Sequence, residues 1–126
     1  MKPCNSIVAE AVARKGRGVF ACEIIRSGDL VETAPTVELG HHDTDTLAAT
    51  CLDDYYFAHP ANPDGGLMVL GLASLCNHSD RPNVRTAARR DDRIGWVIEL
   101  WALRDIAPGE EITRRYACNP WFETAD

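Results

Sequence analysis

Residues suited to chemistry gather in one short stretch, Ala73–Asn83. It overlaps the end of the apolar run Leu67–Leu75 and presents five different polar groups in succession: Asn77, His78, Ser79, Asp80 and Arg81. The apolar run carries these groups toward a core, where a polar group without a hydrogen-bond partner costs about 1–3 kcal/mol. The stretch is therefore either a tightly hydrogen-bonded loop or a ligand site.

Three other features have the residue types of a ligand site. Gly16-Arg17-Gly18 stands early in the chain, and its glycines permit unusual backbone angles and let a ligand approach the main chain. Taken alone, this tripeptide also fits a plain hairpin turn. It is not a phosphate loop, because no helix pattern with Lys and Ser or Thr follows. Late in the chain, the turn Pro108-Gly109-Glu110-Glu111-Ile112 precedes Tyr116.

In this order, these motifs resemble those of the SET-domain protein methyltransferases. The resemblance runs from about Ile7 to Trp121. Length and the run Asp54-Tyr55-Tyr56-Phe57 look most like the compact SET-only enzymes of large algal viruses and some bacteria. The resemblance implies one SET domain over residues 1–126, with no pre-SET or zinc-binding post-SET region. It also implies S-adenosylmethionine as cofactor, S-adenosylhomocysteine as its product, and no metal.

The resemblance implies roles for individual residues. Tyr116 matches the catalytic tyrosine, and Tyr55 matches the tyrosine that lines the lysine channel. The cofactor-binding set is Lys15, Gly16, Arg17, Gly18, Asn77, His78, Tyr116 and Trp121. Each residue also has an ordinary interpretation: the tyrosines as packing, His78 as a hydrogen-bonded loop histidine, Asn77 as a turn former. The joint order and spacing favour the functional interpretation.

The chain departs from the family pattern near both motifs. Asp80 stands where the family has a cysteine after Asn-His-Ser. Thr113-Arg114-Arg115 precedes Tyr116, where an acidic or aromatic residue is common. Ala117 replaces a glycine, and Pro120 replaces a second tyrosine of the viral type. These changes concern the geometry of the lysine channel more than cofactor binding.

Composition limits the class of protein. The 126 residues suit one domain, and a hydrophobic share of 45% predicts a globular core. A net charge of −6 argues against direct binding of nucleic acid and suits a basic, lysine-containing protein or peptide. No run is long enough to cross a membrane, and no secretory signal is recognisable. We therefore expect a soluble, intracellular protein, cytoplasmic if bacterial, with the host nucleus as an alternative.

Elements that position the motifs are short strands separated by turn residues, which indicate a mainly β fold with short helices. Without long helices between strands, a Rossmann-type methyltransferase is disfavoured. Expected strands are residues 7–13, 19–21, 30–32, 36–39, 54–58, 67–70, 84–88, 94–103 and 111–116. We expect a polar loop at 41–45, a short helix at 47–52 and a helical turn at 73–77. The resemblance implies the SET fold, β-clip-like, of several small sheets with a C-terminal pseudo-knot beside the loop Asn77–Asn83.

Alternative functions stay open at this point. A non-catalytic SET-like module could bind S-adenosylmethionine or a basic peptide. A redox or metal protein could use the five cysteines and His41-His42, although no Cys-x-x-Cys pair is present and intracellular thiols are mostly free and buried. The resemblance also suggests a homodimer, with Ile94–Leu103 as the apolar, edge-forming candidate. A histone, a ribosomal protein or a DNA-binding protein would each suit this acidic chain as substrate.

Overall fold

The structure is a computed structural model that describes residues 6–13 and 16–116. Within this part of the chain the fold is mainly β, as predicted, with one short α-helix and two 3-10 turns. The elements are β1 (Ile7–Val12), β2 (Gly16–Ala21), β3 (Leu30–Leu39), α1 (His41–Leu47), η1 (Cys51–Asp54), β4 (Tyr56–Ala58), β5 (Gly66–Val69), η2 (Leu72–Leu75), β6 (Asn77–His78), β7 (Val84–Asp91), β8 (Gly95–Ala102) and β9 (Glu111–Arg114).

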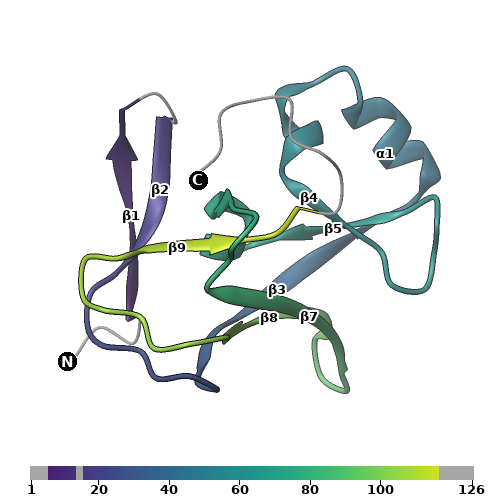
Figure 1. Ribbon diagram of the computed structural model, residues 1–126. Coiled ribbons are helices and arrows are strands. Elements are labelled where there is room, and N and C mark those ends of the chain that lie inside the picture. Colours follow the sequence, from purple (N-terminus) through teal and green to yellow (C-terminus); the bar gives the residue numbers. More distant parts are fainter. Residues whose placement is uncertain (1–5, 14–15, 117–126) are drawn as a thin grey trace.

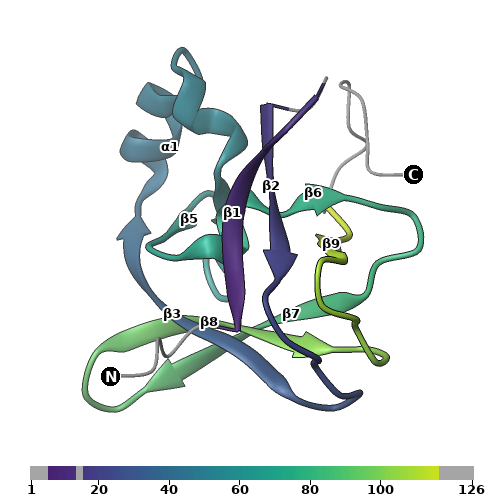
Figure 2. The ribbon, with the colours of Figure 1, turned by 90° about the vertical axis from the view of Figure 1, so that its left-hand side faces the viewer.

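These strands form two sheets. One has the order β1-β2-β9-β6, and the other has the order β4-β5-β3-β8-β7. In Figure 1 the β1–β2 hairpin stands on one side and α1 on the other, with β9 running between them. The turned view shows the β3, β7 and β8 strands crossing below the β1–β2 hairpin (Figure 2). Buried side chains of both sheets meet in one core, including Val19, Leu67, Leu100 and Ile112.

The last strand passes beside the loop that carries the polar cluster. β6 and β9 pair in parallel, with Asn77 opposite Thr113. Further along the loop, the Asn83 side chain brackets β9: its Oδ1 accepts from Thr113 N at 2.8 Å, and its Nδ2 donates to Glu111 O at 2.7 Å. Asn83 is 1% exposed, so these bonds are shielded from water. The expected passage of the C-terminal strand beside residues 77–83 is confirmed.

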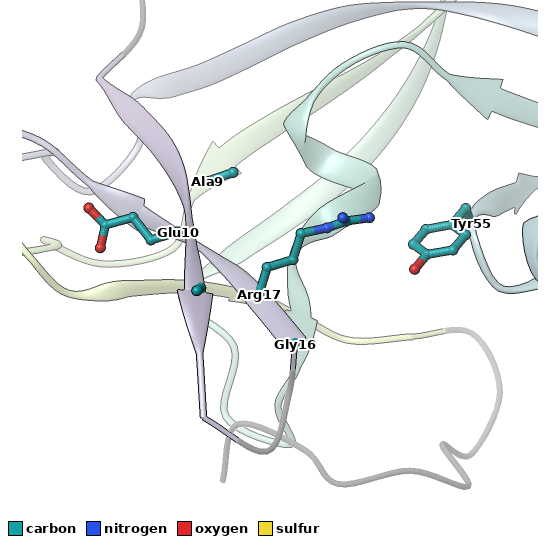
Figure 3. Close-up of a pocket in the computed structure, with 6 residues that line it drawn as sticks. Ala9, Glu10, Gly16, Arg17 and Tyr55 are labelled. Carbon is teal, nitrogen blue, oxygen red and sulfur yellow. The ribbon is translucent and has the colours of Figure 1, made fainter.

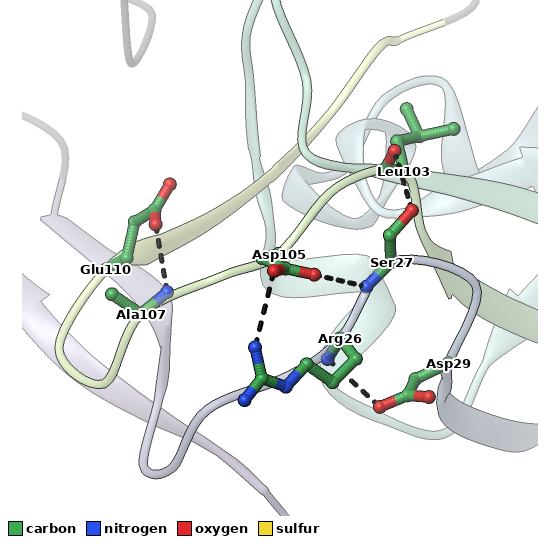
Figure 4. Close-up of polar contacts among 7 residues, drawn as sticks. All are labelled: Arg26, Ser27, Asp29, Leu103, Asp105, Ala107 and Glu110. Atoms are coloured by element: carbon green, nitrogen blue, oxygen red, sulfur yellow. Dashed lines mark hydrogen bonds and ion pairs between the residues drawn. The ribbon is translucent and has the colours of Figure 1, made fainter.

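Two loops hold the approach to β9 in place (Figure 4). The Asp105 carboxylate accepts from Ser27 N at 2.9 Å, which joins the loop before β3 to the loop after β8. Within the predicted turn, Glu110 accepts from Ala107 N at 3.1 Å, and Gly109 adopts a φ of +83°. Glycine tolerates this left-handed conformation because it lacks a Cβ. The chain is thereby turned back into the first sheet at Glu111.

Several predicted strand boundaries are wrong. Residues 30–32 and 36–39 belong to one strand, β3, and Pro35 lies inside it. Pro35 is the last β3 residue paired with β8, and pairing with β5 begins at Thr36. The missing N–H of Pro35 therefore falls where β3 changes partners. β2 begins at Gly16, so the two glycines lie within the strand. β4 begins only at Tyr56, because Asp54 ends η1 and Tyr55 is a turn residue.

The predicted loop at 41–45 is a helix, and the predicted helix at 47–52 is largely wrong. α1 begins after Gly40, whose N–H donates to Asp43 Oδ2 at 2.9 Å while its carbonyl accepts from Thr44 N. A carboxylate in the first turn also stabilises the helix through its attraction to the positive end of the helix dipole. No residue of α1 is buried, so no apolar periodicity marks it in the sequence.

Two smaller expectations also need correction. β8 lies between β3 and β7, so the stretch 94–103 is an interior strand of its sheet rather than an edge. The described thiols Cys22, Cys51 and Cys76 are free, but only Cys76 is buried. No helix among the described residues is long and apolar enough to cross a membrane.

Candidate active site

One edge of β2 is open where the two glycines lie. β2 pairs with β1 along its length but with β9 only at Val19 and Phe20. The two glycines are needed for different reasons. Gly16 has a φ of +77° and open space around it, whereas a Cβ on Gly18 would stand 2.8 Å from Glu111 Oε2 and 3.0 Å from Asn77 Nδ2. Gly16 and Arg17 are therefore exposed at this edge, whereas Gly18 is buried and packed close to Asn77.

The Asn77 side chain ties three strands together. Its Nδ2 donates to the Arg17 carbonyl at 3.1 Å and to Glu111 Oε2 at 2.6 Å. Asn77 is 9% exposed and belongs to β6, while its two partners belong to β2 and β9. Because Nδ2 has only two hydrogens, both are used, and Oδ1 remains as an acceptor.

The His78 side chain is fixed by two contacts. Its Nδ1 accepts from the Tyr116 N–H at 2.9 Å, so its Nε2 carries the proton and donates to Asp80 Oδ1, also at 2.9 Å. The ring also meets the Tyr116 ring edge-on, with centroids 5.2 Å apart. His78 thus positions Tyr116, and Asp80, which departs from the family pattern, orients His78.

Tyr116 is half-buried at the end of this network. Its hydroxyl donates to the Cys76 carbonyl at 3.0 Å. Burial raises the pKa of Tyr116 above its usual value, and the Arg114 charge acts in the opposite direction. The phenol is therefore neutral at physiological pH and can act as a hydrogen-bonding group.

Arg114 was missed as a site residue by sequence reasoning. Its guanidinium lies between two rings, with Cζ 4.4 Å from the Tyr116 centroid and 4.3 Å from the Phe57 centroid. Its Nε donates to the Ala73 carbonyl at 3.2 Å. Two features of the sequence could have identified Arg114. It departs from the family pattern, and it stands two residues before Tyr116, so in an extended chain both side chains lie on the same face.

An open pocket lies beside Gly16 and Arg17 of β2 (Figure 3). Its volume is about 470 Å³, and its lining is Ala9, Glu10, Ala11, Gly16, Arg17 and Tyr55. The Arg17 guanidinium extends toward Tyr55, with Cζ 6.0 Å from the ring centroid. Arg17 therefore contributes an exposed side chain here as well as the carbonyl that binds Asn77.

The structure thus brings most of the predicted site residues into two neighbouring groups. Gly18, Asn77, His78 and Tyr116 form one network, and Gly16, Arg17 and Tyr55 line the pocket beside it. Lys15 and Trp121 lie outside the described residues. Over residues 6–13 and 16–116, no group of three or more His, Cys, Asp or Glu side chains could hold a metal ion.

Comparisons with known proteins agree with this geometry. Residues 16–117 match the family model of the SET domain. A histone-lysine N-methyltransferase of Schizosaccharomyces pombe, specific for lysine 37 of histone H3, is 33% identical over 111 residues, which cover 87% of this chain and 72% of the yeast protein.

Among solved structures, a candidate histone methyltransferase of Plasmodium falciparum is similar with a TM-score of 0.74 and 26% identity, covering 94% of this chain and 99% of that one. A chain of an active polycomb repressive complex 2 is similar in fold, with a TM-score of 0.79 and 21% identity over 98% of this chain but only 16% of its own length. The chain therefore belongs to the SET-domain family and is a protein-lysine methyltransferase that uses S-adenosylmethionine.

Proposed function

We propose that the enzyme methylates a lysine in a basic, histone-like protein, with Tyr116 as the catalytic residue and Tyr55 in the wall of the lysine channel. The observation that supports this most is the fixed Tyr116 hydroxyl, which is held by Cys76 beside the Asn77–His78 pair. The net charge of −6 and the similarity to an enzyme that acts on histone H3 support a basic substrate.

The residues present fit the methionine part of S-adenosylmethionine. Main-chain groups along the open β2 edge at Gly16–Gly18 can bind its carboxylate, and Asn77 Oδ1 can accept from its ammonium group. Gly18 lets this backbone lie against Asn77 without a clash. When bound, S-adenosylmethionine supplies a methyl group on a positively charged sulfonium. Lys15 and Trp121 complete the proposed binding set.

Tyr116 would act by orienting the substrate amine. A lysine must be neutral to attack, because its lone pair forms the new N–C bond. The Tyr116 oxygen donates to Cys76 and can still accept a hydrogen bond from the amine, which fixes the direction of that lone pair. Proximity and orientation of this kind can supply about 7–11 kcal/mol of the barrier reduction. Neither a metal nor a dedicated general base is required by this arrangement.

The test is transfer of labelled methyl groups to histone H3 and to other lysine-rich proteins. Tyr116→Phe removes only the hydroxyl and should lower transfer at least about 100-fold while cofactor affinity changes little. Tyr56→Phe is the matched control, since Tyr56 lies one residue from Tyr55 and its hydroxyl meets only Asp53 among described residues. Full activity of Tyr116→Phe would remove Tyr116 from the mechanism. Transfer only to non-basic proteins would overturn the proposed substrate class.

We also infer a homodimer and the compact viral or bacterial subtype from the resemblance. Exposed apolar side chains on β3, Leu30 at 47% and Val37 at 50%, support a face that a second copy would cover. A monomeric mass in sedimentation would refute the dimer.

A further inference from the structure

Arg114 carries a permanent positive charge into the proposed active site. Its side chain is buried, at 9% exposure, and its guanidinium lies against the face of the Tyr116 ring. Arginine is not deprotonated in proteins, so this charge is present at every working pH.

The site holds this cation by contacts that suit a guanidinium. The two aromatic faces of Phe57 and Tyr116 attract it through their ring quadrupoles, and the Ala73 carbonyl accepts from Nε. The planar, weakly hydrated guanidinium is suited to such a stacked position, whereas a lysine ammonium is not. The charge is thus fixed in place relative to Tyr116.

We propose that Arg114 selects the uncharged form of the substrate amine at Tyr116. A nearby like charge disfavours a protonated amine and lowers its pKa, so the lysine releases its proton to solvent before reaching the Tyr116 hydroxyl. Arg114 would therefore raise the fraction of reactive amine near neutral pH. This inference rests on the proposed role of Tyr116 and adds to it a residue that determines which protonation form of the substrate amine reacts.

Other charges face the same region and affect the absolute pKa of the amine. The titratable groups come from several elements: Glu32 of β3, Asp54 of η1, Tyr55, Cys76, His78 and Glu111 of β9. The Glu32 carboxylate is occupied by the Leu72 and Ala73 N–H groups, and that of Glu111 by Asn77. Whatever their sum, removing one positive charge changes the amine pKa in one direction only, which is upward.

Two substitutions separate the charge of Arg114 from its shape. Arg114→Gln keeps a planar group with a donor for Ala73 but is neutral, and Arg114→Lys keeps the charge but is not planar. We would measure kcat/KM for methyl transfer to a histone H3 peptide from pH 6 to pH 10. For Arg114→Gln we expect the acid limb of this pH profile, where kcat/KM rises as the amine loses its proton, to move up by about one pH unit. At a pH below the limb, the fraction of neutral amine would then be about tenfold lower. For Arg114→Lys we expect the limb to stay near that of the wild type.

Controls separate this proposal from a structural effect and from the proposed function. Arg93→Gln removes a charge from the exposed turn between β7 and β8 and should leave the limb unmoved. Cofactor binding and thermal unfolding identify a damaged fold, and Arg114→Met is the second neutral variant if Arg114→Gln does not fold. An unmoved limb in both neutral variants, or an equal shift in Arg114→Lys, would refute selection by charge. Full activity of Tyr116→Phe would instead refute the proposed function.

Discussion

Gly18 offers the sharpest test of how the proposed cofactor-binding edge of β2, at residues 16–18, is built. Gly18→Ala would put a Cβ 2.8 Å from Glu111 Oε2, 3.0 Å from Asn77 Nδ2 and 3.3 Å from Val12 Cγ2. Contacts under 3 Å cannot persist, so the Glu111 carboxylate has to move away from the Asn77 amide, which it now meets at 2.6 Å. A hydrogen bond to a charged group contributes about 1.5–3 kcal/mol.

This loss has two measurable consequences. Because the Asn77 amide is no longer held where its Oδ1 would meet the cofactor, we expect the Kd for S-adenosylmethionine to rise about 10- to 100-fold in isothermal titration, a loss of about 1.4–2.8 kcal/mol of binding free energy. Since the same contact ties β6 to β9, we expect the melting temperature to fall by about 5–10 °C.

Gly16→Ala is the matched control for Gly18→Ala. Gly16 has nothing within 4 Å of its Cβ position, but its φ of +77° makes an alanine strained by about 1–2 kcal/mol. We expect this variant to lose stability while cofactor affinity falls less than in Gly18→Ala. If Gly18→Ala binds the cofactor as tightly as the wild type, the packing of Gly18 against Asn77 does not shape the site.

Three further predictions concern the framework. Asn83→Ala leaves two buried backbone groups of β9 unpaired and should lower the free energy of unfolding in urea by about 2–5 kcal/mol; no loss would contradict its bracketing role. Glu32→Ala removes the acceptor for two N–H groups of η2 and should cost about 1–3 kcal/mol by the same assay, whereas Glu32→Gln should cost less. Burial raises the pKa of Cys76 from 9.0 to about 12, so its neutral form stabilises the fold up to pH 9 and this contribution declines from pH 9 toward pH 12. Cys76→Ala should make the stability depend less on pH over this range. In the native protein, Cys76 should resist alkylation at pH 8 while the exposed Cys22 reacts. Equal alkylation rates for the two thiols would contradict the burial of Cys76.

Sequence reasoning was accurate where strong local signals coincide. The hairpin of β7 and β8 was predicted from two runs of residues with high strand propensity that flank Asp91-Asp92. The turn before β9 was predicted from Pro108-Gly109. The prediction that Asn77 and His78 lie close to Tyr116 came from the order of the family motifs. Nothing local in either segment specifies that the two segments pair.

Two of the wrong predictions arose because tertiary contacts outweighed a local rule, and one arose because a local capping contact was overlooked. Pro35 suggested a break, but β3 changes partners at that residue and continues. α1 has no buried residue and begins at a stretch of His and Asp residues, where the Gly40–Asp43 contact rather than an apolar face starts it. Arg114 looks like a surface residue by type, since arginine is mostly exposed, and only the two rings around it make burial favourable.

The interior position of β9 in the sheet order β1-β2-β9-β6 bears on how the enzyme is made. β2 and β6 leave the ribosome long before β9, yet they have no partner in common without it. His78 and Tyr116, 38 residues apart in the chain, meet only when β9 inserts between β2 and β6 and pairs with β6. Such non-local pairing is slow because loop closure precedes any stabilising contact. A nascent chain that has not yet emerged through Tyr116 therefore lacks the strand pairing on which the proposed site is built.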